Sequence, residues 1–286
     1  PVFAFGGSTA LKARIDGVNF NLTDDSSHLS TNSILDLGSI NSILKDSKGR
    51  LWTGTQLSIM MTENGRRILA PGLENETIIP SGFNRSLIIE DNQGGIWVGT
   101  RNGLAYMPEN AKRFTFYDGG GTTKLNNVQA MLKDSEGNIW AATDKGLFKF
   151  SSSKVLNFTE QDGLVNSRLS SITETEPGKF VLVTRDNRLY RFSGDSIRPI
   201  EDDIQSFLNT KKEIYHLFTD RKKQLWVGCN GALFRIGQDG WKKWELDNLV
   251  RYVTEGNDGG IYLAVSEKGI GYIDQRESLQ FLSFPG

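Results

Sequence analysis

Short apolar runs recur along the chain, and four of them lead into an acidic turn. The runs cover residues 42–45, 87–90, 130–133 and 216–219, and they contain leucine, isoleucine or other large apolar side chains. Runs this short that stop at a turn predict β-strands. The acidic residues that follow are Asp46, Asp91, Asp134 and Asp220. In the first three copies a glycine comes three places later, and Asp-x-x-Gly predicts a tight hairpin whose glycine takes a positive φ.

Each hairpin leads into a segment that contains a tryptophan. The four segments read Leu-Trp-Thr-Gly-Thr, Ile-Trp-Val-Gly-Thr, Ile-Trp-Ala-Ala-Thr and Leu-Trp-Val-Gly-Cys. A leucine seven residues after Trp97, Trp140 and Trp226 marks a third strand, and residues 113–117, 155–159 and 241–245 predict a fourth. Four antiparallel strands in a repeat of about 40 residues are typical of one blade of a β-propeller.

Three more segments fit the same register without tryptophan. The resulting anchors are Phe3, Trp52, Trp97, Trp140, Val181, Trp226 and Tyr262. Their spacings run from 41 to 49 residues, except for a last spacing of 36. We therefore predict an all-β fold, a seven-bladed β-propeller of four-stranded antiparallel blades whose first blade lacks its innermost strand. One domain over residues 1–286 would hold blades at 1–23, 40–80, 85–118, 127–160, 168–200, 213–247 and 249–286.

The composition narrows the class of protein. Net charge is −1, from 33 basic and 34 acidic residues, and no basic stripe favours nucleic acid or an anionic membrane. No apolar run approaches the roughly 20 residues that span a bilayer, so this segment is not expected to insert. Cys229 occupies the small position held elsewhere by threonine, which predicts a buried residue. Because it is the one cysteine of the sequence, an internal disulfide is excluded.

Chemical motifs are few. The two histidines, His28 and His216, and the single cysteine give no cluster for a transition metal, and we expect neither a metal nor a cofactor. The glycine run at 119–121 lacks phosphate-loop spacing, and each Asp-x-x-Gly turn offers too few oxygens for calcium. Two loop carboxylate pairs, at 24–25 and 202–203, are expected to be solvated. No catalytic residue is predicted.

The long connections between blades should gather on one face of the ring, together with the turns between second and third strands. Faces with variable loops carry the binding sites of such scaffolds. Planar polar groups and aromatic rings there suit hydroxyl-rich ligands such as oligosaccharides. The candidate ligand-binding residues are Asn84, Arg85, Arg101, Asn127, Asp144, Lys145, Arg168, Arg185, Glu213, Tyr215, Asn230 and Arg251.

The repeat, an apolar strand followed by Asp-x-x-Gly-x-Ile-Trp-x-Gly-Thr and Gly-Leu, with Asp162-Gly163-Leu164 as its last element, resembles the two-component regulator propeller repeat. It departs from that pattern at Val181, Tyr262 and Lys223. The resemblance covers nearly the whole chain. It implies the periplasmic sensor region of a Bacteroides-type hybrid two-component histidine kinase, in which a neighbouring propeller and a β-sandwich precede a membrane span and the kinase.

The resemblance thus implies a non-catalytic periplasmic sensor propeller that responds to oligosaccharides from polysaccharide breakdown, with a homodimer as the full-length assembly. Two alternatives stay open. A lyase of the streptogramin-lyase type would need a catalytic histidine near a bound Mg²⁺, and His216 is the only candidate. A protein-interaction scaffold would have no small ligand. We also expect sequence beyond one end of the chain to supply the strand that the first blade lacks.

Overall fold

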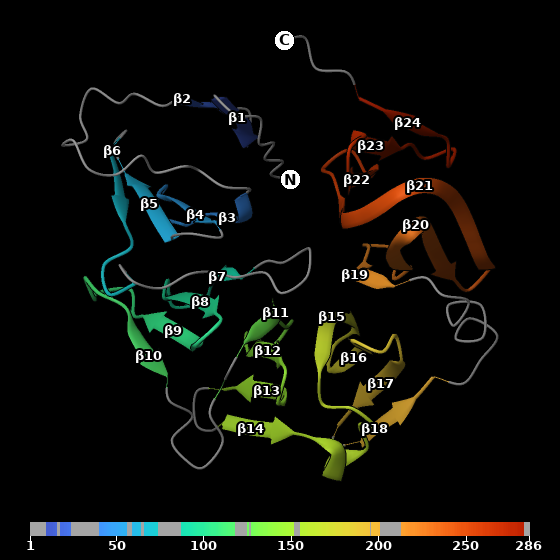
Figure 1. Ribbon diagram of the computed structural model, residues 1–286, viewed down its shortest axis with the longest axis horizontal. Coiled ribbons are helices and arrows are strands. Elements are labelled where there is room, and N and C mark those ends of the chain that lie inside the picture. The colour runs from blue at the N-terminus through green and yellow to red at the C-terminus, as the bar shows by residue number, and fades with distance from the viewer. Residues whose placement is uncertain are drawn as a thin grey trace.

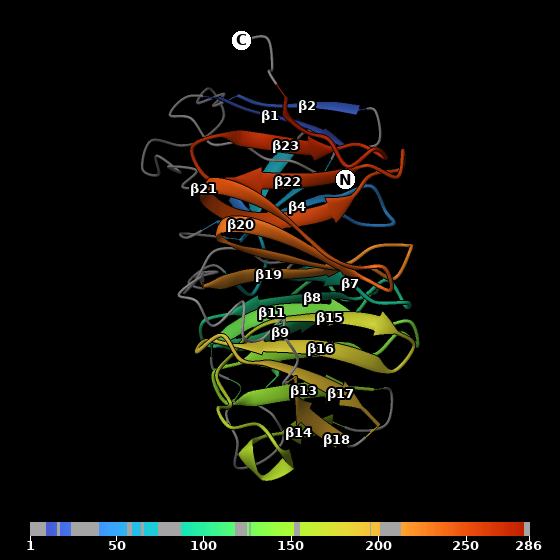
Figure 2. The same ribbon diagram turned by 90° about the vertical axis from the view of Figure 1, so that its right-hand side faces the viewer.

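The computed structural model describes residues 10–15, 18–23, 40–55, 59–63, 66–73, 87–117, 125, 127–151, 155–194, 196–200 and 213–282. These residues form antiparallel sheets joined by turns. Figure 1 shows the sheets arranged around a centre, with one edge strand of each near the middle and the other at the rim. Seen edge-on in Figure 2, the strands run across the ring from one face to the other.

Four sheets have four strands each. Their strands, in chain order, are β3 (Ile40–Lys45), β4 (Leu51–Thr55), β5 (Ile59–Glu63) and β6 (Arg66–Leu69); β7 (Ile88–Glu90), β8 (Ile96–Thr100), β9 (Gly103–Met107) and β10 (Thr115–Tyr117); β11 (Val128–Lys133), β12 (Ile139–Thr143), β13 (Gly146–Phe150) and β14 (Val155–Phe158); β15 (Leu169–Glu176), β16 (Lys179–Thr184), β17 (Leu189–Ser193) and β18 (Ser196–Pro199). A short 3-10 helix, Glu160–Asp162, lies between β14 and β15.

A fifth sheet has six strands: β19 (Ile214–Thr219), β20 (Leu225–Gly237), β21 (Gly240–Glu255), β22 (Ile261–Val265), β23 (Gly269–Ile273) and β24 (Leu279–Phe281). The hairpin of β1 (Ala10–Ile15) and β2 (Val18–Thr23) forms a separate two-stranded sheet.

The prediction of seven four-stranded blades is therefore wrong. The described residues form five blades of at least four strands, besides the hairpin β1–β2. The segments 213–247 and 249–286, predicted as separate blades, share one sheet because β21 belongs to both. The first half of β21 pairs with β20 and the second half pairs with β22, and Figure 1 shows the strand sweeping from the rim toward the centre. The strand expected at residues 2–5 lies outside the described residues.

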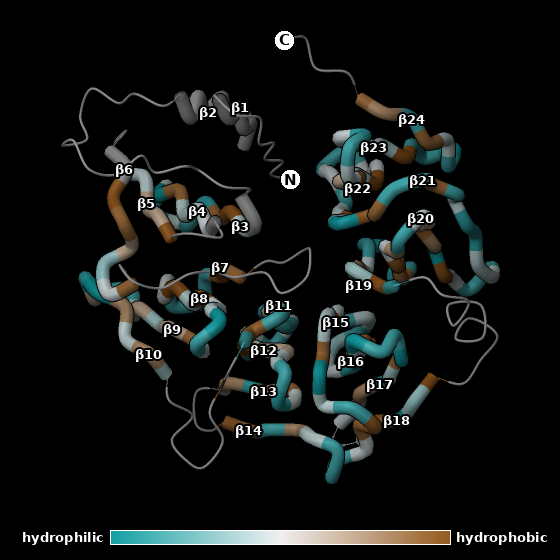
Figure 3. The backbone as a smooth tube through the Cα atoms, viewed as in Figure 1, coloured by the Kyte–Doolittle hydropathy of each residue, from teal (hydrophilic) through white to brown (hydrophobic). Residues whose placement is uncertain are grey.

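The hydrophobic core lies between neighbouring sheets. In Figure 3 hydrophobic residues recur along the strands of neighbouring sheets, as expected for sheets that pack face to face. Trp52 and Trp140 are fully buried, and Trp226 is 3% exposed. Val181 and Tyr262 occupy the same register position as the tryptophans, because each pairs with the corresponding residue of its innermost strand. Trp97 is only half-buried and stacks on Tyr106 at 4.2 Å between ring centroids.

An aspartate fixes each of the four anchor tryptophans, Trp52, Trp97, Trp140 and Trp226. Oδ1 of Asp134 accepts the backbone N–H groups of Glu136 and Asn138, at 3.0 and 2.7 Å, and Oδ2 accepts the indole N–H of Trp140 at 2.7 Å. The same indole bond recurs at 2.8 to 2.9 Å in the pairs Asp46–Trp52, Asp91–Trp97 and Asp220–Trp226. Where tyrosine replaces tryptophan, Asp258 accepts from the Tyr262 hydroxyl at 3.0 Å. One carboxylate thus closes the turn and orients the core ring.

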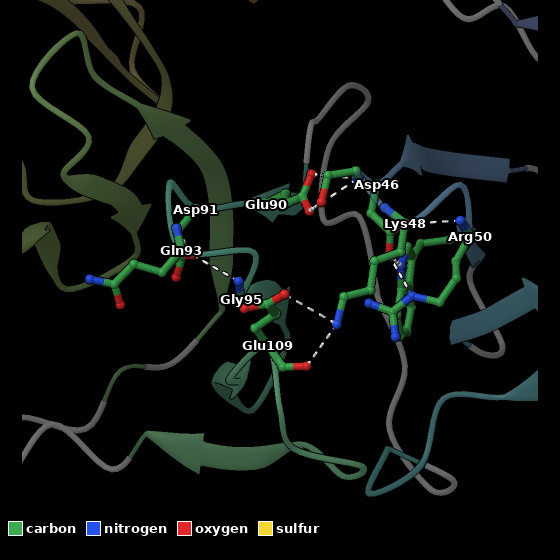
Figure 4. Close-up of polar contacts among 10 residues, drawn as sticks. Asp46, Lys48, Arg50, Glu90, Asp91, Gln93, Gly95 and Glu109 are labelled. Atoms are coloured by element: carbon green, nitrogen blue, oxygen red, sulfur yellow. Dashed lines mark hydrogen bonds and ion pairs between the residues drawn. The ribbon is translucent and has the colours of Figure 1, made fainter.

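A glutamate at the end of an innermost strand connects some sheets across the same face. Glu90, at the end of β7, accepts the backbone N–H of Ser47 in the preceding sheet at 2.9 Å (Figure 4). Glu174 does the same for Ser135 at 2.8 Å. These two bonds hold the Asp-x-x-Gly turn of one sheet against the next sheet. Within the six-stranded sheet, Glu255 likewise accepts the N–H of Arg221 at 2.8 Å.

Candidate functional site

The antiparallel topology divides the connections between two faces of the ring. We call the side with the Asp-x-x-Gly turns, such as residues 134–138, the turn face. The opposite side, which we call the loop face, carries the turns between second and third strands at 101–102, 144–145, 185–188 and 266–268, and the residues that lead into each innermost strand. All ten described candidate binding residues belong to the loop face or the strand ends beside it; Asn84 and Arg85 lie outside the described residues.

Five of the candidates form one connected group over three sheets. The backbone N–H of Asn127 donates to the carbonyl of Arg101 in the preceding sheet at 2.7 Å. The Asn127 amide then donates to Oδ2 of Asp144 at 2.6 Å. The other oxygen of Asp144 lies 3.7 Å from Nε of Arg185 in the next sheet. The N–H of Arg185 donates to the carbonyl of Arg168 at 2.8 Å.

Four more candidates continue this group into the six-stranded sheet. Asn187, in the same turn as Arg185, accepts the N–H of Ile214 at 2.9 Å, which places Glu213 beside that turn. The carbonyl of Glu213 accepts from the N–H of Asn230 at 2.9 Å, and its carboxylate accepts from the Tyr215 hydroxyl. Nε of Arg251, the fourth of these candidates, donates to the hydroxyl of Ser266. We call the whole set, from Arg101 to Ser266, the polar belt.

A recurring β-bulge sets the positions of Tyr215 and Arg251. The register of the innermost strand slips by one residue at its loop-face end in five places, and the extra residues include Gln129, Ser170, Tyr215 and Arg251. Bulges re-aim side chains next to functional sites. The predicted candidates did not include Gln129 and Ser170, which are both buried, nor Asn187 and Ser266. The Asp186-Asn187 turn could have indicated Asn187, because asparagine tolerates the positive φ of 64° found there.

Burial and neighbouring charges shift two pKa values in the belt. Burial, followed by the hydrogen bond to Glu213, raises the pKa of the Tyr215 hydroxyl to about 12. Burial lowers the pKa of the Arg251 guanidinium, while its interaction with Tyr215 works in the opposite direction. Tyr215 is therefore a neutral donor at physiological pH. The described atoms leave Oδ1 of Asp144 buried without a hydrogen bond, so the belt contains an acceptor beside a cation.

We expect Tyr215 to ionise only near pH 12, well above the pH at which an exposed tyrosine ionises, because its pKa is raised to about 12. Because its folded pKa is raised from an unfolded value of about 10, its stabilising contribution is complete below that pH and is lost as the pH rises through about 12. Absorbance titration of tyrosinate should show a late step that shrinks in Tyr215→Phe. In Glu213→Gln the same step should move to lower pH. An unchanged titration in both variants would contradict the contact between Tyr215 and Glu213.

Lys145 stands apart from the connected group. Its side chain is exposed, and its backbone N–H donates to the Thr143 hydroxyl at 3.0 Å. The pKa of Glu160 is lowered mainly by the hydrogen bond from Ser167, and the positive charge of Lys145 lowers it to a lesser extent. Lys145 thus lies at the edge of the loop face.

His216 lies on β19 next to Tyr215 and contacts the neighbouring strand. Its Nδ1 accepts the backbone N–H of Val253 at 3.1 Å, and its ring stacks on Tyr252 at 4.6 Å between centroids. Ser42 and Ser171 occupy the same register position and accept the N–H groups of Leu87 and Leu217. The position therefore joins neighbouring innermost strands. In the described part of the chain, no group of three or more His, Cys, Asp or Glu could hold a metal ion.

Comparison with a family model identifies the repeats. Residues 34–56, 79–102 and 124–145 match the family described as "Two component regulator propeller". No curated protein matches the chain as a sequence relative.

Solved structures share the fold at low sequence identity. The extracellular domain of a hybrid two component system from B. thetaiotaomicron is 16% identical with a TM-score of 0.70, and the match covers 90% of this chain and 37% of that one. Another such domain from the same organism is 16% identical with a TM-score of 0.72, covering 98% and 47%. This chain therefore spans less than half the length of these two. Virginiamycin B lyase from Staphylococcus aureus is 13% identical with a TM-score of 0.65, covering 96% and 89%.

Within the described ranges, no helix has the length and apolar character needed to cross a membrane. Three repeats of this chain thus match the two component regulator propeller family, and its fold is similar to those of extracellular domains of B. thetaiotaomicron two component systems.

Proposed function

We propose that this domain is a non-catalytic, periplasmic sensor module that binds an oligosaccharide at the polar belt of its loop face. The observation that carries the proposal is the continuity of the belt, which places planar amide, carboxylate and guanidinium groups on adjacent sheets. Sugars present many hydroxyl groups that both donate and accept, and such groups satisfy them in pairs. Tyr215 adds an aromatic ring and a neutral donor beside Arg251.

Asp144 is the central residue of this proposal. Its Oδ2 accepts from Asn127, whereas among the described residues its buried Oδ1 has no hydrogen bond and lies 3.7 Å from Nε of Arg185. A ligand hydroxyl that donates to Oδ1 would satisfy an acceptor whose burial otherwise costs free energy. The candidate residues on three sheets, which the Asp144 carboxylate connects, would then bind the ligand together.

A thermal-shift screen of glycan fragments from plant and host polysaccharides tests this function. Binding to the folded state raises the melting temperature. We expect Asp144→Asn and Arg251→Gln to abolish the shift given by an active fragment. Arg188→Gln is the matched control, because Arg188 is exposed on the same face and pairs with Asp186 at 3.3 Å. Equal shifts in all three variants would place the ligand away from the belt.

We propose in addition how this domain acts together with the other domains of the full-length signalling protein. A neighbouring propeller and a β-sandwich of the same chain would adjoin this domain, and a histidine kinase would act across the membrane as a homodimer. Ligand at the loop face would shift the arrangement of rigid propellers in that dimer. Analytical ultracentrifugation of the entire periplasmic region, with and without its glycan, measures the change. A monomer under both conditions would contradict ligand-driven dimerisation.

A lyase is the second candidate, because virginiamycin B lyase shares the fold over most of both chains. His216 distinguishes the two functions. If it joins strands through Val253, His216→Gln should keep an acceptor and leave ligand binding intact. His216→Ala should lower the free energy of unfolding by about 1 kcal/mol through loss of one hydrogen bond. Streptogramin cleavage by the native protein that disappears in both variants would favour the lyase instead.

A further inference from the structure

His216 connects the two halves of the six-stranded sheet through one ring atom. Its Nδ1 accepts the backbone N–H of Val253 at 3.1 Å, and Val253 belongs to the half of β21 that pairs with β22. The imidazole ring stacks on Tyr252 at 4.6 Å between centroids and an interplanar angle of 28°. An imidazole therefore holds β19 beside β21 at this point.

The hydrogen bond to Val253 requires a neutral ring. A nitrogen that accepts a hydrogen bond has no proton, so the single proton of the neutral ring is on Nε2. The second proton of an imidazolium has to go on Nδ1, the atom that faces the Val253 N–H. Two donors would then face each other and the bond would be lost. Ser42 and Ser171, at the same register position, accept through hydroxyl groups that do not titrate.

The surroundings of His216 disfavour a further positive charge. Arg251 precedes Tyr252, and burial already lowers the pKa of its guanidinium. Stacking on Tyr252 favours a charged ring, but that attraction is smaller at a partly exposed site than the cost of leaving a backbone N–H without its acceptor. The described titratable or charged groups on the segments around His216 are Glu213 and Tyr215 before it, Cys229 on β20, and Arg251 and Tyr252 on β21; β15 contributes Ser171 and Thr173, which do not titrate.

The contact lies directly beside two residues of the polar belt. The β-bulges of β19 and β21 fall between Ile214 and His216 and between Val250 and Tyr252. Their extra residues are Tyr215 and Arg251, which therefore precede the two residues of the stacked pair. Loss of the bond to Val253 would release both strand ends that carry these belt residues.

We propose that His216 is a pH-sensitive contact, whose protonation separates β19 from β21 and displaces Tyr215 and Arg251. The separation of the strands follows from the contacts of His216 alone. A second consequence, weaker binding at the belt in acid, rests on the function proposed above.

The direction of the pH dependence follows from the hydrogen bond. Because the bond favours the neutral ring, it holds the pKa of His216 below the value of about 6.5 for an exposed histidine. A contribution of this sign is complete above the unfolded pKa of about 6.5 and is lost as the pH falls through the folded pKa. The contact is therefore closed at neutral pH and opens in acid.

NMR titration of the native domain tests the proposal. The sequence has 2 histidines, so the imidazole resonances that are absent from His216→Gln belong to His216. One hydrogen bond shifts such a titration by roughly one pH unit, which places the expected midpoint near about pH 5.5. The backbone amide resonance of Val253 should shift with the same midpoint. A His216 midpoint at or above about pH 6.5, or a Val253 amide that does not follow it, overturns the proposal.

The stability of His216→Gln gives a second measurement, because glutamine can keep an acceptor but does not titrate. From about pH 7.5 to about pH 4.5, the unfolding equilibrium constant of the native domain should rise about tenfold more than that of the variant, the equivalent of one pKa unit. Ser171→Ala is the matched control: it removes the equivalent contact with Leu217 and keeps His216, so its pH profile should parallel the native one. Parallel profiles for the native domain and His216→Gln would contradict the proposal.

The consequence for the belt is measured with the glycan fragment that gives the largest thermal shift at neutral pH. The native domain should bind this fragment about fivefold more weakly at about pH 5 than at about pH 7.5, as the loss of one hydrogen bond implies. His216→Gln should bind it equally at both. Equal binding by the native domain, while the Val253 amide still follows His216, overturns the link to the belt. If no fragment binds at neutral pH, the function proposed for the belt fails, and the titration without ligand still decides whether the strand contact opens.

Discussion

Replacing Trp140 with alanine should lower the free energy of unfolding by about 3–5 kcal/mol, as large-to-small core substitutions do. The side chain is 1% exposed and packs against three phenylalanine rings from two sheets. Alanine would leave a cavity that the β-strands cannot close. It would also leave the Asp134 carboxylate without its indole donor. Chemical denaturation of the variant measures the loss.

Trp97→Ala is the internal comparison. Trp97 has the same aspartate contact but is only half-buried, so its loss should be smaller. A cost below about 1 kcal/mol for Trp140→Ala would mean that the junction collapses around the missing ring. Similar costs for both variants would show that the aspartate contact, rather than burial, dominates.

Asp134→Ala should cost roughly 2–4 kcal/mol, because hydrogen bonds to a charged group contribute most and their buried donors would be left unpaired. The carboxylate is 6% exposed and accepts from two backbone N–H groups and from the indole of Trp140. The variant would therefore loosen the turn and the core ring together. Denaturation midpoints compared with the exposed-site control Asp186→Ala give the difference.

A double-mutant cycle separates the two contributions of Asp134. If the carboxylate acts through the indole, the combined variant Asp134→Ala with Trp140→Phe should cost clearly less than the sum of the single changes. If the free-energy costs of the two single changes are additive, the whole effect of Asp134→Ala comes from its hydrogen bonds within the turn.

The local structure of each repeat could be predicted from the sequence. Asp-x-x-Gly followed by tryptophan has strict spacing, and the hairpin that it predicts depends on neighbouring residues alone. The indole bond from Trp140 to Asp134 could also have been anticipated, since both residues recur six positions apart. The contacts of Glu90 and Glu174 could not, because they join residues about 40 positions apart across two sheets.

The blade count failed for a local reason. Asn230-Gly231 has the composition of a turn, but the chain forms a bulge there, and β20 continues through it. The polar residues at 247–248 predicted a connection, yet they lie within β21. Propensity cannot distinguish a bulge from a turn when both require a flexible backbone.

The sequence predicted on which face of the ring the candidate residues lie, but not which of them contact each other. Strand order alone assigns Asp144 and Arg185 to the same side of the ring. Their approach to 3.7 Å depends on how two sheets pack. The bulge that sets Tyr215 and Arg251 at equivalent positions has no signature in the residues themselves.

The continuity of β21 also has a mechanical consequence. A propeller whose blades are joined by flexible loops can lose them one at a time, since each contacts only its neighbours. Here one strand carries the hydrogen bonds of both halves of the six-stranded sheet. Pulling on the C-terminal strands would transmit force directly along β21 to β20, so residues 213–282 would resist and then give way as one cooperative unit.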